Sequence, residues 1–261
     1  MSDVVKIVGF SGIGDFLLAA KCAHFVCQAE KYPYLYACCR DEVFNPLQFI
    51  FDGIFKLEQL PEEYSDRVLF DNNLINELKG NCEEYYVCKP DFLHRNIYAF
   101  DYHKYNTNPN LLKKTRLLTH KFNPRKGNIF IGLMSTTNGY LYKYIPNLVI
   151  NLANNLTNYT FHFSVVDKWA GIDIKWGELE SCPKNLVVYR NQKIEDQINI
   201  LRSCEYGIYT DNGLSHLSWE YGQNRLILDP QYERPIWNSR WKESTEDCIN
   251  INTSVRDIVE L

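Results

Sequence analysis

Residues 209–217 constrain this chain more than any other part of its sequence. They follow the short apolar run 206–209 and lead into apolar residues at helical spacing, so a buried strand here passes into a helix. The first turn of a helix presents unpaired backbone N–H groups with partial positive charge, and Gly213 lets a phosphate approach the main chain. The pattern predicts an α/β fold with an anion site at this turn, flanked by Asp211 and His216.

A purely structural interpretation of the same residues stays open. Asp211 or Asn212 can be the N-cap of the helix, a common role for both residue types. His216 can be an ordinary buried imidazole. Taken alone, the motif does not decide between a binding site and a helix cap.

A second strand-to-helix turn opens the chain. Residues 4–10 have the pattern of a buried strand, and residues 11–15 form a tight turn into a helical pattern, which together predict the first βα unit of a Rossmann-type domain. Gly12 and Gly14 begin the dinucleotide-binding pattern, but Leu17 stands where its third glycine belongs. A nicotinamide or flavin site is therefore disfavoured, and an NAD-dependent oxidoreductase ranks last among the enzyme classes considered.

Asp15 is the polar side chain of interest in this first turn. It lies at the carboxyl end of the first strand, where open α/β sheets place their ligands, so it is a candidate functional carboxylate. The alternative is that its charge only complements the positive end of the helix dipole.

Together, the two turns resemble those of the heptosyltransferases that build the inner core of lipopolysaccharide, which are nucleotide-sugar transferases of the glycosyltransferase family 9 and GT-B type. In that family a Gly-Asp pair opens the first helix, and Gly14 and Asp15 match it. An Asp-Thr/Ser-Gly-x-x-His motif marks the donor site, and residues 211–216 match it with Asn212 in place of Thr or Ser.

Two further segments carry the same resemblance. Residues 128–133 look like the first strand of the family's C-terminal domain, and residues 143–146 look like its Lys-x-Trp-Pro segment. The resemblance covers most of residues 125–235 and only the opening turn of the N-terminal half.

The implied fold is α/β and GT-B-like, with two Rossmann-type, doubly wound parallel-sheet domains facing a central cleft. Residues 1–122 would form the acceptor side with the catalytic base, and residues 123–261 the nucleotide-sugar donor side. Alternating hydrophobic patterns agree with two such domains. Strands are expected near residues 4–10, 34–39, 54–57, 67–70, 84–88, 128–133, 159–166, 185–189, 206–210, 225–228 and 248–251. Helices are expected near residues 15–30, 72–79, 146–156, 194–203, 213–221 and from 253 to the end.

The resemblance also implies an inverting, metal-independent transfer of a heptose or hexose from a nucleoside-diphosphate sugar to a hydroxyl of a glycan or glycolipid acceptor. Asp15 would be the catalytic base, with Gly12 and Gly14 shaping its turn. The donor would be bound by Lys143, Gln192, Asp211, Asn212, Gly213, Leu214 and His216. Within that set, Lys143 and the helix start would hold the diphosphate, and Asp211 would bond the sugar hydroxyls. The loop containing Gln192 would pack against the nucleotide base.

Charge and cysteine content exclude several other classes. The net charge of −4 argues against nonspecific nucleic-acid binding, which depends on Lys and Arg neutralising phosphates. No apolar stretch is long enough to span a bilayer, and no signal peptide is recognisable. Nine cysteines without a metal-like CxxC pair indicate reduced thiols, and the six histidines are scattered, so no metal site is expected. No cofactor is expected either, because the nucleotide sugar would be a substrate. A cytoplasmic protein is expected, with peripheral membrane attachment left open.

Two alternative functions remain. A non-catalytic protein that keeps the fold and binds a nucleotide sugar or glycan is favoured by Asn212 and by a short N-terminal half. A nucleotide-sugar epimerase or hydrolase on the same plan would need no acceptor. Residues 89–118 have weak periodicity, which fits an acceptor-binding region or merely irregular packing.

Overall fold

A computed structural model divides the protein into two compact units, Met1–Leu117 and Leu118–Leu261. It describes residues 3–10, 12–88, 105, 115–133, 145–169, 172–174, 176–177, 179, 182–210 and 212–227. The boundary expected from sequence lay between residues 122 and 123. The residues just before it belong to the second unit, because the Leu118 amide donates to the Glu220 carbonyl at 3.1 Å.

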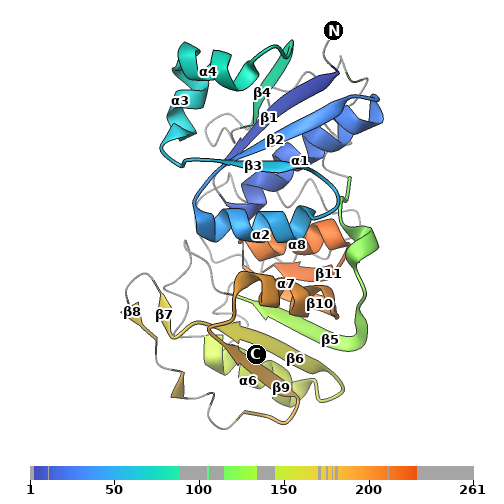
Figure 1. The fold of residues 1–261 in the computed structure, drawn as a ribbon. Helices are drawn as coiled ribbons and strands as arrows, with labels where there is room; N and C mark the ends of the chain where they lie inside the picture. The colour runs from blue at the N-terminus through green and yellow to red at the C-terminus, as the bar shows by residue number, and fades with distance from the viewer. Residues whose placement is uncertain are drawn as a thin grey trace. The chain divides into compact units, whose positions relative to one another are not determined.

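The first unit is built on a four-stranded, wholly parallel sheet with the order β3-β2-β1-β4 (Figure 1). Its strands are β1 (Val4–Phe10), β2 (Tyr32–Cys38), β3 (Leu57–Leu60) and β4 (Glu84–Cys88). Its helices are α1 (Ile13–Gln28), α2 (Asp41–Phe51), α3 (Tyr64–Phe70) and α4 (Asn72–Lys79).

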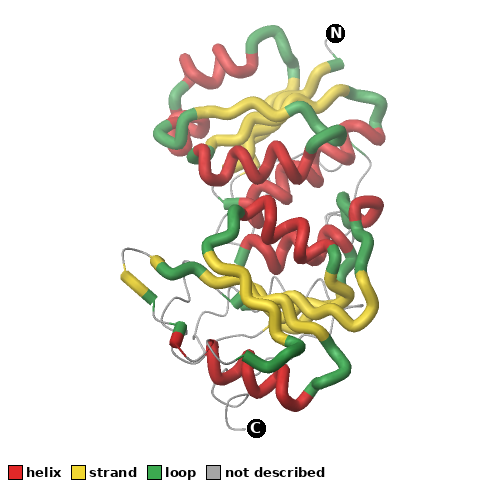
Figure 2. The backbone as a smooth tube through the Cα atoms, turned by 60° about the horizontal axis from the view of Figure 1, so that its bottom comes forward, coloured by secondary structure: helices red, strands yellow, loops and turns green. Residues whose placement is uncertain are grey.

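Helices cover both faces of this sheet because successive residues of β1 alternate between them. On one face Gly9 allows α1 to pack closely, since a Cβ at that position would lie 2.5 Å from the Phe16 ring. On the other face Val8 belongs to a core cluster that includes Val68 of α3 and Leu74 of α4. The result is a doubly wound layer structure, with helices on either side of the strands (Figure 2).

The second unit has a five-stranded parallel sheet with the order β11-β10-β5-β6-β9. Its strands are β5 (Arg125–Gly132), β6 (Thr160–Val165), β9 (Leu186–Arg190), β10 (Cys204–Tyr209) and β11 (Asn224–Ile227). Its helices are α6 (Ile145–Asn155), α7 (Ile194–Arg202), α8 (Gly213–Tyr221) and the 3-10 turn η1 (Thr119–Lys121). A short antiparallel pair, β7 (Lys168–Trp169) and β8 (Ile172–Asp173), follows β6.

This sheet is also covered on both faces. Ile131 of β5 and Phe163 of β6 pack with Leu148 of α6 in one core cluster. Phe130 and Tyr209 stack in a tilted pair on the opposite face, where α7 and α8 lie (Figure 1). Two doubly wound parallel-sheet units are therefore confirmed. A cleft between them stays a prediction.

Most expected elements are found within a few residues. One expected strand is a helix, another is shifted, and one helix and the short β7–β8 pair were not expected. Residues 67–70, expected as a strand, lie in α3; a short apolar run fits a buried strand or a buried helix equally well, and Val68 packs as a helical residue. The strand expected at 54–57 is β3, at Leu57–Leu60. Helix α2 was missed because Pro46 interrupts its pattern. The elements expected at 248–251 and from 253 onward lie outside the described residues.

The half-buried His162 is expected to make the stability of the second unit depend on pH. His162 Nδ1 lies 2.9 Å from the Tyr189 hydroxyl, and burial, with a smaller effect of the Arg125 charge, lowers the pKa of His162. The unfolded chain therefore binds a proton at His162 more readily, so this residue reduces the free energy of unfolding as the pH falls below about 6.5.

We expect His162→Gln, which can still bond Tyr189, to lose this contribution. Denaturant unfolding from pH 7.5 to 5 should show a shallower decline than in the wild type, by at most about 1.4 kcal/mol per pH unit for one proton. Identical pH profiles would contradict the assignment.

Candidate functional site

Each sheet has a position where the strand order reverses. The chain proceeds from β1 outward to β2 and β3 and then returns to place β4 on the other side of β1. In the second sheet it proceeds from β5 to β6 and β9 and then returns to place β10 beside β5. Ligands of open α/β sheets bind outside the carboxyl ends of the strands at such a switch point. The turns after β1, β5 and β10 are therefore the candidate site of each unit.

Asp15 lies at this position in the first unit. It is half-buried in the first turn of α1, directly after the carboxyl end of β1. Gly12 is the N-cap and supplies no side chain to cap the helix, while its carbonyl accepts from the Phe16 amide at 3.0 Å. No described residue accepts from the amides of Ile13 and Gly14. The turn therefore combines a carboxylate with two open backbone donors.

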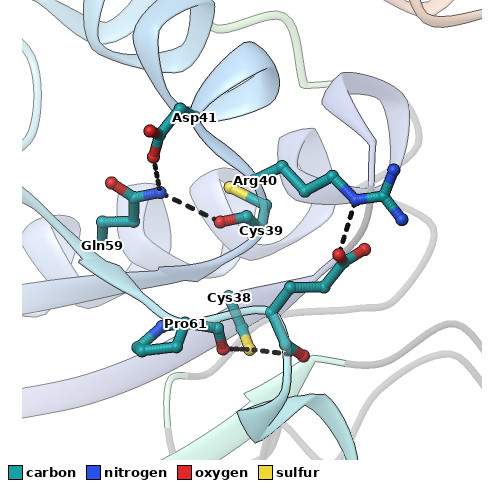
Figure 3. A network of polar contacts seen from close by, with 7 residues as sticks. Cys38, Cys39, Arg40, Asp41, Gln59 and Pro61 are labelled. Atoms are coloured by element: carbon teal, nitrogen blue, oxygen red, sulfur yellow. Dashed lines mark hydrogen bonds and ion pairs between the residues drawn. The ribbon is translucent and has the colours of Figure 1, made fainter.

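Polar contacts join the ends of β2 and β3 and the residues that follow them at the same edge of the first sheet (Figure 3). The Gln59 amide donates to the Cys39 carbonyl at 3.1 Å and to the Asp41 carboxylate at 2.8 Å. Arg40 and Glu62 form an exposed ion pair, with Nε and Oε2 at 2.5 Å. Such a pair adds little stability in water. The network lies at the carboxyl edge of the sheet in the unit that the resemblance assigns to the acceptor, and it was not predicted from the sequence.

The turn between β10 and α8 is built around Asn212. Its Oδ1 accepts from the Ser215 amide at 2.9 Å, and its own amide donates to Ser215 Oγ at 3.2 Å, which forms a capping box. Its Nδ2 donates to the Gly132 carbonyl at the end of β5 at 2.7 Å. Asn212 thus ties the start of α8 to the neighbouring strand at the switch point.

This geometry gives Asn212 the N-cap role that the structural interpretation allowed. Its side chain is engaged by the protein, so a direct side-chain contact with a donor stays a prediction. The amides of Gly213 and Leu214 have no acceptor among the described residues. At the start of a nine-residue helix these two groups are suited to an anion.

Close packing holds this turn against β5. A Cβ on Gly132 would approach the Tyr209 ring to 2.9 Å, so the glycine makes room for the buried tyrosine of β10. Thr210 Oγ1 donates to the Leu133 carbonyl at 3.3 Å. The position of the α8 amides is therefore fixed by the core beneath them.

Gln192 lies in the turn between β9 and α7, at the carboxyl edge of the same sheet. It is half-buried, and no described residue bonds its side-chain amide. The preceding residue, Asn191, has a positive φ of 52° and is bonded to Asp167 after β6. Sequence reasoning missed Asp167, because nothing in its local pattern indicates a contact with residue 191.

The structure brings together part of the predicted set. Four of them lie at the first turns of α8, namely Asn212, Gly213, Leu214 and His216. Gln192 follows β9 at the same edge of the sheet, three strands from β10. His216 is half-buried. Gly12, Gly14 and Asp15 share the turn in the first unit. Lys143 and Asp211 lie outside the described residues.

The described residues contain no cluster of three His, Cys, Asp or Glu side chains that could hold a metal ion. The eight cysteines within the described part are free thiols. Among the helices that the structure describes, none has the length and apolar character needed to cross a membrane.

The chain shares its fold with solved nucleotide-sugar enzymes. E. coli heptosyltransferase WaaC with ADP aligns with 98% of this chain and 96% of its own, at a TM-score of 0.59 and 11% identity. The family 9 glycosyl transferase from Veillonella parvula DSM 2008 aligns with 100% of this chain and 91% of its own, at a TM-score of 0.59 and 10% identity. A putative UDP-N-acetylglucosamine 2-epimerase from Listeria monocytogenes aligns with 98% of this chain and 86% of its own, at a TM-score of 0.54 and 11% identity.

No protein-family model and no curated protein sequence matches the chain. The structural similarities establish an α/β, GT-B-like fold of the heptosyltransferase kind, so the fold expected from sequence is confirmed. Because only about one residue in ten is identical, these similarities do not establish the reaction, which has to be argued from the site itself.

Proposed function

We propose that this protein is a glycosyltransferase that moves a heptose or hexose from a nucleoside-diphosphate sugar to a hydroxyl of a glycan or glycolipid. The observation that carries the proposal is the α8 start, where the open amides of Gly213 and Leu214 meet the switch point of a GT-B-like sheet. Backbone donors of this kind recognise a diphosphate without a metal ion. A cytoplasmic location with peripheral membrane attachment belongs to the same proposal.

The proposed reaction is an inverting displacement. The acceptor oxygen attacks the anomeric carbon, the bond from that carbon to the diphosphate oxygen breaks, and the nucleoside diphosphate leaves. Asp15, a carboxylate in the first turn of α1, takes the proton of the acceptor hydroxyl. The α8 amides stabilise the negative charge that develops on the leaving diphosphate.

The remaining roles rest on the resemblance. Lys143 would neutralise the diphosphate, Asp211 would bond the sugar hydroxyls, and His216 would orient the turn or touch a phosphate. Gln192 would lie beside the nucleotide base. The heptosyltransferase WaaC structure contains ADP, which favours an adenine nucleotide here.

Two other functions are supported by particular observations. A sugar-nucleotide epimerase or hydrolase is supported by the similarity to the putative Listeria 2-epimerase. A non-catalytic binding protein is supported by Asn212, which stands in place of the family's Thr or Ser and whose side chain caps α8 and donates to the Gly132 carbonyl.

The decisive experiment is a thermal-shift panel of ADP-, GDP-, UDP- and TDP-linked sugars, followed by product analysis with and without acceptor glycans. A ligand at a hundred times its dissociation constant stabilises the folded protein by about 2.7 kcal/mol. Transfer to an acceptor supports the proposal, and a changed or hydrolysed sugar without acceptor supports the epimerase or hydrolase. Binding without turnover supports the non-catalytic alternative, and no binding by any donor overturns all three.

Lys143→Ala tests the donor side. If the ammonium group contacts the diphosphate, its removal should weaken nucleoside-diphosphate binding by about 1.5–3 kcal/mol, the range for a hydrogen bond to a charged group. Isothermal titration measures the change, and Lys184→Ala, in the loop before β9, is a lysine control. Equal affinities with an intact circular-dichroism spectrum would remove Lys143 from the site.

A further inference from the structure

We propose that Asp167 and Asn191 form a clamp that positions the Gln192 turn for the nucleoside end of the donor. Both are positioning residues, and neither is required to touch the ligand. The inference rests on the proposed function, since it concerns the same donor. It gives Asn191 a positioning role and adds Asp167, which neither the sequence motifs nor the switch-point argument identifies.

The clamp is reciprocal. The Asp167 amide donates to Asn191 Oδ1 at 2.9 Å, and Asn191 Nδ2 donates to Asp167 Oδ2 at 2.7 Å. Arg190 Nη1 donates to the other carboxylate oxygen of Asp167 at 2.9 Å. The Asn191 amide donates to the Val165 carbonyl at 2.8 Å. The carboxyl ends of β6 and β9 are thus joined by four hydrogen bonds beyond the strand ladder.

The bonds hold a backbone that is unfavourable for most residues. Asn191 has a φ of 52°, in the left-handed region, which asparagine tolerates better than other non-glycine residues. The next residue is Gln192, so the conformation of Asn191 sets the direction in which the chain enters α7. Losing the clamp should therefore move Gln192 without unfolding the sheet.

The other half of the clamp is anchored in the core. Ile174 donates its amide to the Asp167 carbonyl at 2.8 Å, which closes the segment that contains β7 and β8. Trp176 Nε1 donates to the Val166 carbonyl at 2.9 Å, and its buried ring packs edge-on against Phe163. The residue before Asp167 is thus held by a buried aromatic side chain, while the Asp167 carboxylate itself is exposed.

The position of the clamp relative to α8 fits the two ends of a nucleoside diphosphate. Between β10 and β9 the sheet contains β5 and β6, so the two strand ends are separated by three strand spacings, or roughly 14 Å. A diphosphate at the α8 amides would direct its nucleoside along this edge toward β9. The half-buried Gln192 side chain, unbonded among the described residues, is available there.

An exchange of the two clamp side chains tests the proposal. Asp167→Asn leaves one oxygen for the two donors Arg190 and Asn191, and Asn191→Asp opposes two carboxylates, so each disrupts the clamp. The double variant restores the side-chain bond between residues 167 and 191 with donor and acceptor exchanged, and Arg190 then meets a neutral amide oxygen. Each single variant should bind the nucleoside diphosphate about tenfold more weakly. The double variant should return to near the wild-type affinity, because the effects of substitutions at two residues in contact are not additive. The ligand is whichever of ADP, GDP, UDP and TDP binds the wild type most tightly.

Inorganic pyrophosphate is the internal control. If the clamp acts on the nucleoside end, pyrophosphate affinity should be equal in all four proteins, and the KM for donor should rise in the single variants without a matching fall in kcat. Equal nucleotide affinities in the four proteins, or equal losses for pyrophosphate and nucleotide, would overturn the clamp and leave the proposed function standing. Failure of the wild type to bind any of the four nucleotides would overturn both.

Discussion

Replacing Asp15 with Asn is expected to lower turnover by about 10²–10⁴, the usual contribution of general-base catalysis, and to change donor affinity by less than about threefold. The substitution keeps the size of the side chain and removes its ability to accept the acceptor proton. The effect should appear in turnover because a base acts on the acceptor hydroxyl in the transition state. Steady-state kinetics with saturating donor, together with titration of donor binding, measures both quantities.

The competing explanation makes a different prediction. If Asp15 only complements the dipole of α1, Asp15→Asn should cost no more than about 1 kcal/mol of stability and leave turnover nearly intact. Asp196 offers a matched control, because it is an acidic residue in the first turn of α7. Asp196→Asn should affect only stability. Near-normal turnover in Asp15→Asn would end the catalytic assignment.

The helices whose bounds were predicted best have local signals at their ends. Helix α4 begins after Asp71, whose carboxylate accepts from the amides of Asn73 and Leu74. Helix α8 begins after Asn212 and ends at Tyr221, just before Gly222, which has a φ of 83°. Caps of this kind are encoded within a few residues, so a single sequence is enough to locate them.

The features that sequence reasoning missed depend on contacts between distant residues. Pro46 lies inside α2 and is buried there, so tertiary packing outweighs a local signal that normally ends a helix. Gln59 of β3 pairs with Asp41, the first residue of α2, and Asp167 pairs with Asn191 between the ends of β6 and β9. Neither partner has a distinctive local pattern, and the strand order that brings them together cannot be read from one sequence.

In the candidate site, too, the local signals could be predicted from the sequence and the contacts between distant residues could not. The polar turn at residues 210–214 was recognisable from its composition, but the support beneath it was not. Gln223, before β11, donates its side-chain amide to the carbonyls of Leu201, Cys204 and Tyr206 and accepts from the hydroxyl of Tyr209. Gly207 leaves room for this arrangement, since a Cβ there would lie 2.2 Å from the Tyr209 ring and 2.5 Å from Gln223 Oε1. The network joins the end of α7 to the beginnings of β10 and β11, and Tyr209, the last residue of β10, connects it to the turn that carries the proposed diphosphate site.

Gln223→Leu is expected to destabilise the protein by about 3–5 kcal/mol, because several buried polar groups lose their partner at once. Gln223 is 1% exposed and Tyr209 is fully buried, so water cannot replace the lost bonds without opening the core. Denaturant unfolding, with the midpoint and slope compared with those of the wild type, measures the change.

Tyr209→Phe provides the test of mechanism. Removing the hydroxyl from the wild type deprives Gln223 Oε1 of its donor, whereas removing it from Gln223→Leu takes away a buried group that has already lost this acceptor. The double variant should therefore be more stable than the sum of the single effects predicts, by about 1–2 kcal/mol. If the two changes in the free energy of unfolding simply add, the Tyr209–Gln223 bond contributes nothing to holding β10. The 210–214 turn would then be positioned by the Asn212 and Thr210 contacts alone.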